Sequence, residues 1–449
     1  MTSQSFEAPR RSRGNHINGN AFPAEKAVPH GPGAHTSHGR RTGHRTGHRT
    51  GLGPETIAAQ AGGSVDAATG AIVPPIHVAT TFVRDADNQY RRGYCYGRSD
   101  NATVRQVEDV LSELEKGRAT LMFASGMAAA ATAFLALDRP AHVVAPSAMY
   151  WGLRQWLTED APGHGIEATF VDAGDPQALR AAIRPGRTRL VWIETPSNPV
   201  WTVTDIGEAA RIAHAAGALL AVDSTVPTPV LTRPIPLGAD LVLHSATKYL
   251  NGHSDVVAGA IVFAETGEAY EAAARLRTML GGILGALEAA LLLRGMRTLH
   301  VRVRHQCASA MAIAAYFQGH PAITQVLYPG LAKHRGHTIA ARQMQGGFGG
   351  MLSMRFKGGE QAAIASAAAM QVWKRATSLG GVESLVEHRS SIEGTGSPCP
   401  ADLLRFSVGL ETIGDLIADI EQSLNVAASL QPTGTPSREP CNAAWRDDE

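Results

Sequence analysis

LVLHSATKYLNGHSDVVAGA, residues 241–260, begins as an apolar strand that ends at Ser245 and is followed closely by Thr247 and Lys248. In open α/β sheets, ligands bind beyond the carboxyl ends of the strands, so this strand would deliver Lys248 to the expected ligand crevice. A lysine that follows a strand is, on its own, usually a surface residue. The interpretation of Lys248 therefore depends on what the other strands carry at their ends.

Short apolar segments alternate with helical segments on both sides of this strand. The alternation predicts an α/β fold with a mostly parallel sheet that is covered by helices on both faces. The predicted strands are ATLMFAS from residue 119, HVVAPS from 142, EATFV from 167, RLVWIET from 189, LLAVD from 219 and VAGAIVF from 257. The predicted helices begin at Gly126, near Trp151, at Pro176 and at Asp205. After about residue 300, Ala-rich helical stretches, the strand MLSMRF and a helix over 413–424 predict a smaller α+β domain.

A carboxylate stands at the end of the predicted strand LLAVD, where Asp223 is the last residue. A buried Asp without a partner would be costly, so a cationic partner is expected for it. The ring nitrogen of a pyridine cofactor is such a partner, because a strand-end carboxylate keeps the nitrogen protonated and makes the ring an electron sink. Asp223 and Lys248 at two strand ends therefore favour a site for pyridoxal 5'-phosphate (PLP), with Lys248 forming a Schiff base.

A third strand end could bind a phosphate group. The segment FASGMAAA begins a predicted helix with Ser125, Gly126 and Met127. Backbone N–H groups at a helix N-terminus bind phosphate, and glycine permits close approach of the ligand. Small residues at such a turn are commonly a matter of packing alone. A phosphate site is nevertheless favoured here, because Ser245 and Thr247 would add two hydroxyl groups as phosphate ligands.

Charge is distributed unevenly along the chain, whose formal net charge is +1. Residues 1–52 hold eight Lys or Arg against two acidic residues and include the repeat RTGHRTGHRTG. A segment with so little apolar surface cannot offset the entropy of ordering, so a disordered basic tail is predicted. Its six histidines are more simply solvated residues than metal ligands, since no acidic residues accompany them. The remaining chain has no concentrated basic face, and no nucleic-acid partner is predicted.

The cysteines and the hydropathy indicate a cellular location. Four cysteines, Cys95, Cys307, Cys399 and Cys441, are scattered without a CxxC pair, which suggests neither a zinc site nor a disulfide framework. No metal site is predicted. No window approaches the ~20 apolar residues of a membrane span, and the N-terminus lacks the apolar stretch of a signal peptide. We therefore expect a cytoplasmic protein without membrane contact.

Seven motifs in a fixed order carry a resemblance to a known family. They read YGRSDNAT at 96–103, SGMAA at 125–129, ETPSNP at 194–199, VDST at 222–225, SATKYLNGHSD at 245–255, SLGGVESL at 378–385 and LLRFSVGLE at 403–411. From about Thr56 to Leu424 the chain resembles the Cys/Met-metabolism, or trans-sulfuration, family of PLP enzymes. That family includes cystathionine γ-synthase, cystathionine γ- and β-lyases and methionine γ-lyase.

The resemblance implies a fold-type-I PLP enzyme and a role for each matching residue. It implies cofactor contacts from Lys248, Asp223, Thr225, Gly126, Met127, Ser245 and Thr247, together with Tyr96 and Arg98, which reach the phosphate of the neighbouring subunit. This sharing implies a homodimer at least; a homotetramer is the expected assembly for such an enzyme, and the sequence leaves the choice between dimer and tetramer open. The implied division is a tail at 1–52, an arm at 53–118 that contacts the neighbouring subunit, a large domain at 119–305, a small domain at 306–430 and a tail at 431–449.

The resemblance also implies how a small amino-acid substrate is held. Tyr150 matches a tyrosine that stacks on the cofactor ring and places a phenol near the reacting carbon. Arg405 matches the clamp for the substrate carboxylate, with Ser378 and Asn198 close by. Lys248, once displaced by the substrate amine, is the general base that removes the Cα proton. Lys248 and Tyr150 are thus the predicted catalytic residues.

The leading prediction of function is β- or γ-elimination from cystathionine or another sulfur amino acid, which gives a 2-oxo acid and ammonia. The alternatives are γ-replacement on an O-acyl-homoserine, a γ-lyase reaction on another Cγ-heteroatom substrate such as canavanine, and, less favoured, an aminotransferase or a non-catalytic protein. Cys95 stands where γ-synthases and γ-lyases typically carry an acid, and EHRSSIEG at 387–394 differs from the HPASMTH of the synthases. Glu383 within SLGGVESL resembles the γ-enzymes. The leaving group stays open.

Overall fold

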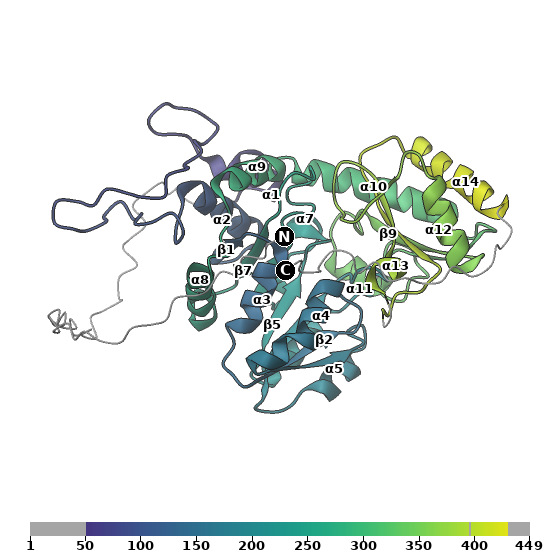
Figure 1. The fold of residues 1–449 in the computed structure, drawn as a ribbon, viewed down its shortest axis with the longest axis horizontal. Coiled ribbons are helices and arrows are strands. Elements are labelled where there is room, and N and C mark those ends of the chain that lie inside the picture. Colours follow the sequence, from purple (N-terminus) through teal and green to yellow (C-terminus); the bar gives the residue numbers. More distant parts are fainter. Residues whose placement is uncertain (1–50, 395–396, 430–449) are drawn as a thin grey trace, which may run out of the picture. The chain divides into compact units, whose positions relative to one another are not determined.

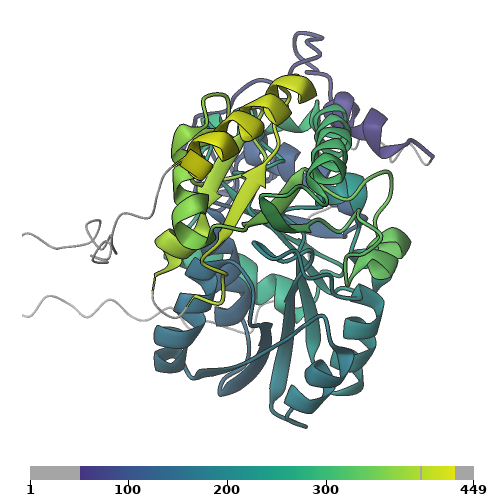
Figure 2. The same cartoon turned by 90° about the vertical axis from the view of Figure 1, so that its right-hand side faces the viewer.

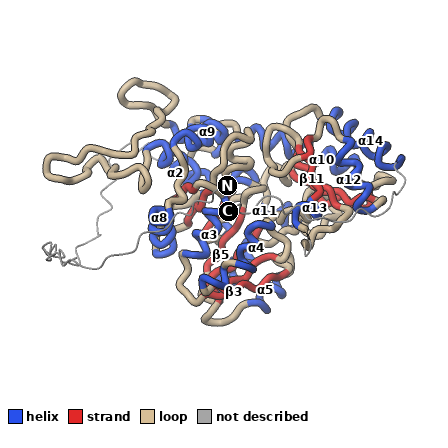
Figure 3. The backbone as a smooth tube through the Cα atoms, viewed as in Figure 1, coloured by secondary structure: helices blue, strands red, loops and turns tan. Residues whose placement is uncertain are grey.

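The structure, a computed structural model, describes residues 51–394 and 397–429. The predicted tails at 1–52 and 431–449 lie outside these ranges, apart from Gly51 and Leu52. The described chain contains two β-sheets, and Figure 3 shows their strands (red) gathered in two groups. The predicted boundary between residues 305 and 306 falls inside the long helix α10, Leu299–Phe317. The division into an arm and two domains stays a prediction.

The larger sheet has seven strands in the order β1-β7-β6-β5-β4-β2-β3. Its strands are β1 Ala119–Phe123, β2 Ala141–Pro146, β3 Ile166–Val171, β4 Thr188–Glu194, β5 Leu219–Asp223, β6 Leu241–His244 and β7 Gly259–Phe263. Strands β2 to β6 pair in parallel, and β7 runs antiparallel to both β6 and β1. The prediction of a mostly parallel sheet is confirmed, and every predicted strand of this sheet is present.

Helices cover both faces of this sheet because successive side chains of each strand point to opposite faces. On β4, Val191 and Ile193 pack in one core, while Leu190 and Trp192 pack in the other. The first core also receives helices α2 Ala102–Glu115, α5 Pro176–Ala182, α6 Ile206–Ala215 and α9 Ala286–Met296, and the second receives α3 Gly126–Leu135, α4 Trp151–Glu159 and α8 Glu268–Leu280. Figures 1 and 2 show these helices around the sheet.

The smaller sheet has five strands in the order β10-β11-β12-β9-β8. They are β8 Ile323–Leu327, β9 Met351–Phe356, β10 Lys374–Arg375, β11 Leu385–His388 and β12 Leu403–Ser407. A third core joins this sheet to helices α10, α12 Gly359–Ala369 and α14 Ile413–Ser429. The remaining helices of the described ranges are short: α1 Pro54–Ala59, α7 Thr228–Leu231, α11 His337–Gln343 and α13 Arg389–Glu393. The smaller α+β unit predicted after residue 300 is therefore present.

A long segment, whose one named element is the short 3₁₀-helix Ala61–Gly63, connects α1 to α2. Figure 1 shows it as purple and dark blue loops that extend to the left of the large sheet. Six of its apolar side chains, Val65, Ile72, Val73, Ile76, Val78 and Val83, are exposed by between 47% and 83%. Many exposed apolar residues within one segment are typical of a surface that another chain covers. Across the ranges that the structure describes, no helix is both long and apolar enough to cross a membrane.

Candidate active site

Two carboxylates lie side by side at the carboxyl edge of the large sheet. Glu194 ends β4, Asp223 ends β5, and the two residues are paired in the strand register. Ser245 follows β6 and Ser125 precedes α3 at the same edge. The predicted strand-end residues therefore meet where an open α/β sheet binds its ligand.

Asp223 is held by the residue two positions further along the chain. The backbone N–H and the hydroxyl of Thr225 both donate to Oδ1 of Asp223, at 3.0 and 2.6 Å. The Thr225 hydroxyl also accepts a hydrogen bond from the backbone N–H of Ser245 at 2.8 Å. Thr225 thus ties the end of β5 to the turn after β6, and Oδ2 of Asp223 has no hydrogen-bond partner among the described residues.

Glu194 was not predicted as a site residue, although it ends a strand as Asp223 does. It is 6% exposed, and its carboxylate accepts hydrogen bonds from the backbone N–H groups of Tyr150 at 2.7 Å and Asn198 at 2.8 Å. Burial, and next the charge of Asp223, raise the pKa of Glu194 to about 8. Burial also raises the pKa of Asp223. This pair of carboxylates favours protonation or a bound cation.

The N-terminus of α3 forms a cradle beside Ser245. Ser125 caps the helix, and its hydroxyl accepts from the backbone N–H of Ala128 at 3.0 Å, which leaves the N–H groups of Gly126 and Met127 without partners in the described chain. A Cβ on Gly126 would lie 3.0 Å from Cβ and Oγ of Ser245, so only glycine leaves this space open. The arrangement can bind an anion through backbone N–H groups and a serine hydroxyl.

Thr247 is less free than its neighbour Ser245. Its hydroxyl donates to the carbonyl of Ala258 at 3.1 Å and accepts from the N–H of Ala258 at 3.0 Å. These bonds fix the turn that carries Lys248. The hydroxyl of Thr247 has one lone pair left for a further ligand.

Lys248 lies against a cationic neighbour and a serine. Its Nζ donates to Oγ of Ser378 at 2.8 Å. Burial, and next the charge of Arg405, lower the pKa of Lys248 to about 8. Ser378 has a φ of 92°, an unusual conformation for a residue with a side chain and one that clusters at functional sites. The structure therefore places the predicted residues Lys248 and Ser378 within hydrogen-bond distance of each other.

Arg405 is 3% exposed and makes three contacts through its terminal nitrogens. They reach Oδ1 of Asn198 at 3.2 Å, the carbonyl of Ser378 at 2.8 Å and the carboxylate of Glu387 at 2.5 Å. Its Nε has no hydrogen-bond partner in the described chain, and burial lowers the pKa of Arg405 to about 10. The predicted substrate residues Asn198, Ser378 and Arg405 thus form one cluster.

Tyr150, Tyr96 and Arg98 are not drawn into this cluster. Tyr150 is 46% exposed, and no side-chain hydrogen bond of Tyr150 to another described residue is present. Arg98 lies over the ring of Tyr96, 5.8 Å from the ring centroid, and donates to the carbonyl of Thr278 at 2.5 Å. No contact of Tyr96 or Arg98 with Lys248 occurs within the described part of this chain.

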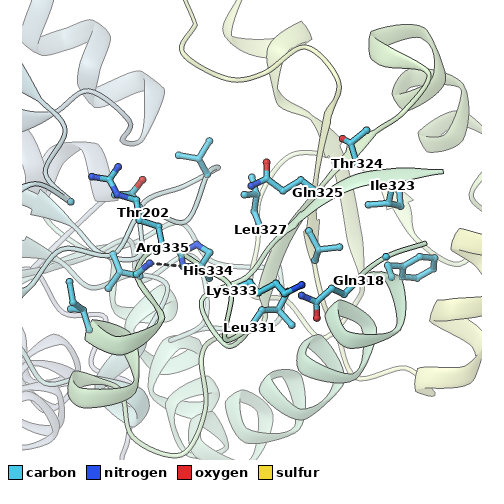
Figure 4. Close-up of a pocket in the computed structure, with 18 residues that line it drawn as sticks. Thr202, Gln318, Ile323, Thr324, Gln325, Leu327, Leu331, Lys333, His334 and Arg335 are labelled. Atoms are coloured by element: carbon cyan, nitrogen blue, oxygen red, sulfur yellow. Dashed lines mark hydrogen bonds between the residues drawn. The ribbon is translucent and has the colours of Figure 1, made fainter. Parts of the chain in front are cut away.

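A pocket of about 580 Å³ lies elsewhere, between the loop around Thr202 and the edge strand β8. Figure 4 shows Thr202 and Arg335 on one side and Gln325 and Gln318 on the other. None of the predicted site residues lines it. Its lining combines no buried base with buried carboxylates, in contrast to the strand-end cluster.

The strand-end cluster fits PLP. The two carboxylates, which favour a cation, would face the pyridinium of the cofactor. The backbone N–H groups at the start of α3, where only glycine leaves room at position 126, would hold its phosphate. Lys248, whose pKa is lowered, would bind its aldehyde. An open α/β sheet with this set of groups defines the class of PLP-dependent enzymes with a lysine at the strand ends.

The comparisons with known proteins agree. The family described as "Cys/Met metabolism PLP-dependent enzyme" matches residues 55–425, and the chain belongs to this family. It is 44% identical to a cystathionine gamma-synthase of Mycobacterium tuberculosis over 378 residues. This alignment covers 83% of the present chain and 97% of the relative. The chain is 39% identical over 378 residues to a cystathionine gamma-lyase of Bacillus subtilis, covering 82% and 98%. A solved cystathionine gamma synthase of Xanthomonas oryzae pv. oryzae, in complex with cystathionine, has a TM-score of 0.81 and 38% identity over 85% of this chain and 100% of that one.

These findings confirm the predicted fold type I, the PLP cofactor and a PLP-dependent enzyme of the trans-sulfuration type. The individual roles of the site residues remain predictions. Glu194 and Glu387 were not predicted as site residues. A charged residue in or at the end of an apolar strand does not show, from the sequence alone, which side chain it will contact.

Proposed function

We propose that this enzyme eliminates a substituent from the β- or γ-carbon of a cystathionine-like amino acid and releases a 2-oxo acid and ammonia. The observation that carries the proposal is the contact of Lys248 with Ser378, whose carbonyl binds Arg405. Lys248, the proposed base, and Arg405, the proposed cation for the substrate carboxylate, thus lie in one site. A second candidate, γ-replacement on an O-acyl-homoserine, is favoured by the names of the Mycobacterium and Xanthomonas relatives.

We assign the cofactor residues from their contacts. Asp223 would hold the ring nitrogen of PLP, and Thr225 would keep its carboxylate in place. The N–H groups of Gly126 and Met127, with the hydroxyls of Ser245 and Thr247, would bind the phosphate. When bound, PLP withdraws electrons from the α-carbon of an amino acid.

The chain's own residues then bind the substrate and move its protons. Arg405, with Asn198 beside it, would bind the α-carboxylate, since a guanidinium suits a bidentate contact with a carboxylate. Lys248 would take the proton from Cα, because its pKa of about 8 suits a general base near neutral pH. A leaving group on Cγ requires a second proton transfer from Cβ, which the flexible Lys248 side chain would also perform. Tyr150 would stack on the cofactor ring.

Product analysis separates the two candidate reactions. The enzyme is incubated with cystathionine, methionine, homocysteine, cysteine, O-acyl-homoserines and canavanine, with and without added cysteine. A 2-oxo acid and ammonia formed without added thiol would support elimination. A thioether formed only with cysteine and an O-acyl-homoserine would support replacement and overturn the leading proposal.

We propose further that each active site takes its phosphate arm from a neighbouring chain, in a dimer or a homotetramer in the cytoplasm. Arg98 lies over the ring of Tyr96, which is 46% exposed, and donates to the carbonyl of Thr278 on α8. The free state of the described thiols, Cys95, Cys307 and Cys399, suits a reducing compartment.

Hybrid dimers test the shared site. Lys248→Ala and Arg98→Ala parents, each poorly active, are dissociated and reannealed in equal amounts. About half the dimers would be hybrids with one intact site each, so roughly a quarter of wild-type activity should return. Hybrids that regain nothing beyond the average of the parents would refute the shared arm.

A further inference from the structure

Glu387 lies between two arginines in the small sheet. Glu387 on β11 and Arg405 on β12 are register partners, and Oε2 of Glu387 accepts hydrogen bonds from Arg405 at 2.5 Å and from Arg389 at 3.0 Å. Arg389 begins α13 and also donates to Oε1 of Glu393 through NH2 at 2.8 Å and through Nε at 3.1 Å. All four residues are 7% exposed or less. They form a buried, electrically balanced group at the edge of the proposed active site.

This arrangement poses a problem for Arg405. A carboxylate already occupies one of its terminal nitrogens, so an incoming substrate carboxylate would meet the charge of Glu387 as well as that of Arg405. At short range inside a protein, repulsion between like charges is large. Arg389 offsets it, because Glu387 and Glu393 raise the pKa of Arg389 above its usual value despite burial, and Arg389 stays charged beside Glu387.

We propose that Arg389 is a positioning residue that neutralises Glu387 and thereby leaves Arg405 free to bind the α-carboxylate of the substrate. Arg389 would not touch the substrate. Its partner Glu393 fixes the guanidinium from the other side, four residues along α13. The proposal rests on the proposed role of Arg405, and it assigns a function to the segment EHRSSIEG, whose charged residues the sequence motifs left unexplained.

Two small probes measure carboxylate binding separately from amine binding. Butanoate carries the carboxylate of the substrate without its amine, and butylamine carries the amine without the carboxylate. Calorimetric titration of the holoenzyme gives the dissociation constant of each. In Arg389→Met the affinity for butanoate should fall roughly ten- to a hundredfold, while that for butylamine stays unchanged. With a reacting substrate, KM should rise and kcat should change little.

Two charge-matched double variants separate the proposed role from a merely structural one. Arg389→Met with Glu387→Gln and Arg389→Met with Glu393→Gln each remove one arginine and one acid from the same buried group, so both variants leave the formal charge of the group unchanged. The first removes the acid that contacts Arg405 directly, so butanoate should bind about as in the wild type. The second leaves Glu387 uncompensated, so binding should remain weak.

The controls fix what each outcome means. Arg355→Met breaks an Arg–Asp pair of the same sheet, at 2.8 Å from Asp402, and should change neither probe. Equal butanoate affinity in the two double variants, or an unchanged affinity in a folded Arg389→Met protein, would overturn the proposal. Arg405→Met tests the role of Arg405, on which this proposal rests. If neither Arg405→Met nor Arg389→Met weakens butanoate binding, the proposed role of Arg405 is wrong. If Arg405→Met weakens binding and Arg389→Met does not, only the proposed role of Arg389 is wrong.

Discussion

The hydroxyl of Thr225 connects the two ends of the proposed cofactor site, and its removal gives a measurable loss. In Thr225→Val the hydrogen bond to Oδ1 of Asp223, at 2.6 Å, and the bond accepted from the N–H of Ser245, at 2.8 Å, both disappear. A hydrogen bond to a charged group contributes roughly 1.5–3 kcal/mol. If that orientation of Asp223 is needed to hold PLP, the dissociation constant of PLP should rise roughly 10- to 150-fold.

The measurement is a titration of apoenzyme with PLP, followed by absorbance, together with thermal unfolding of the apoenzyme. Thr188→Val is a matched control, because the Thr188 hydroxyl also accepts from a backbone N–H, that of Arg184 at 2.8 Å, and contacts a buried side chain, His142, at 2.8 Å. Thr188 begins β4 at the opposite edge of the sheet. We expect it to lower thermal stability without changing the affinity for PLP. A Thr225→Val enzyme whose PLP affinity equals that of the control would refute the reasoning.

Three further predictions follow from the titrating groups. Burial lowers the pKa of Lys248 to about 8, so the labelling rate of Lys248 in the apoenzyme by an amine reagent should rise through pH 8 and not through its usual value of 10.5; a midpoint near 10.5 would contradict this. Asp223→Asn should retain PLP but slow the exchange of the α-hydrogen of an amino acid with D₂O, measured by NMR, because a neutral amide does not hold a pyridinium; an unchanged exchange rate would contradict the role. The folded apoenzyme keeps the proton of Glu194 up to about pH 8, whereas the unfolded chain releases it near the usual value of 4.5, so stability should fall as pH rises between these values. Glu194→Gln should flatten that fall in thermal unfolding temperatures, and an unaltered slope would count against it.

The strands of the large sheet could be predicted from the sequence because each is a short apolar run bounded by polar turns. LLAVD coincides with β5, Leu219–Asp223, and the other runs agree within two residues or so. The direction of β7 could not be predicted, since an apolar run has the same composition whether it pairs parallel or antiparallel. The sheet of the smaller unit was predicted only through MLSMRF, because β11 and β12 carry the buried charges of Glu387 and Arg405, which interrupt the apolar pattern.

Part of the candidate site could likewise be predicted from the sequence, and part could not. Lys248, Asp223 and Ser245 could be placed together from sequence, because strand ends of one open sheet share an edge. The pairing of Arg405 with Glu387 and Arg389 could not, since it depends on the register of β11 against β12 and on a helix of five residues, α13. Buried ion pairs form through three-dimensional neighbours that no local pattern encodes.

The central claim is that Lys248 carries the cofactor in a PLP-dependent enzyme. The holoenzyme is treated with borohydride, which makes the lysine–cofactor link permanent, and its peptides are then weighed and sequenced by mass spectrometry. We predict a single modified lysine, Lys248, with the mass of one reduced cofactor group, and no modification in Lys248→Ala. A cofactor group found on another lysine such as Lys333, or an enzyme that binds PLP without any covalent link, would contradict the account.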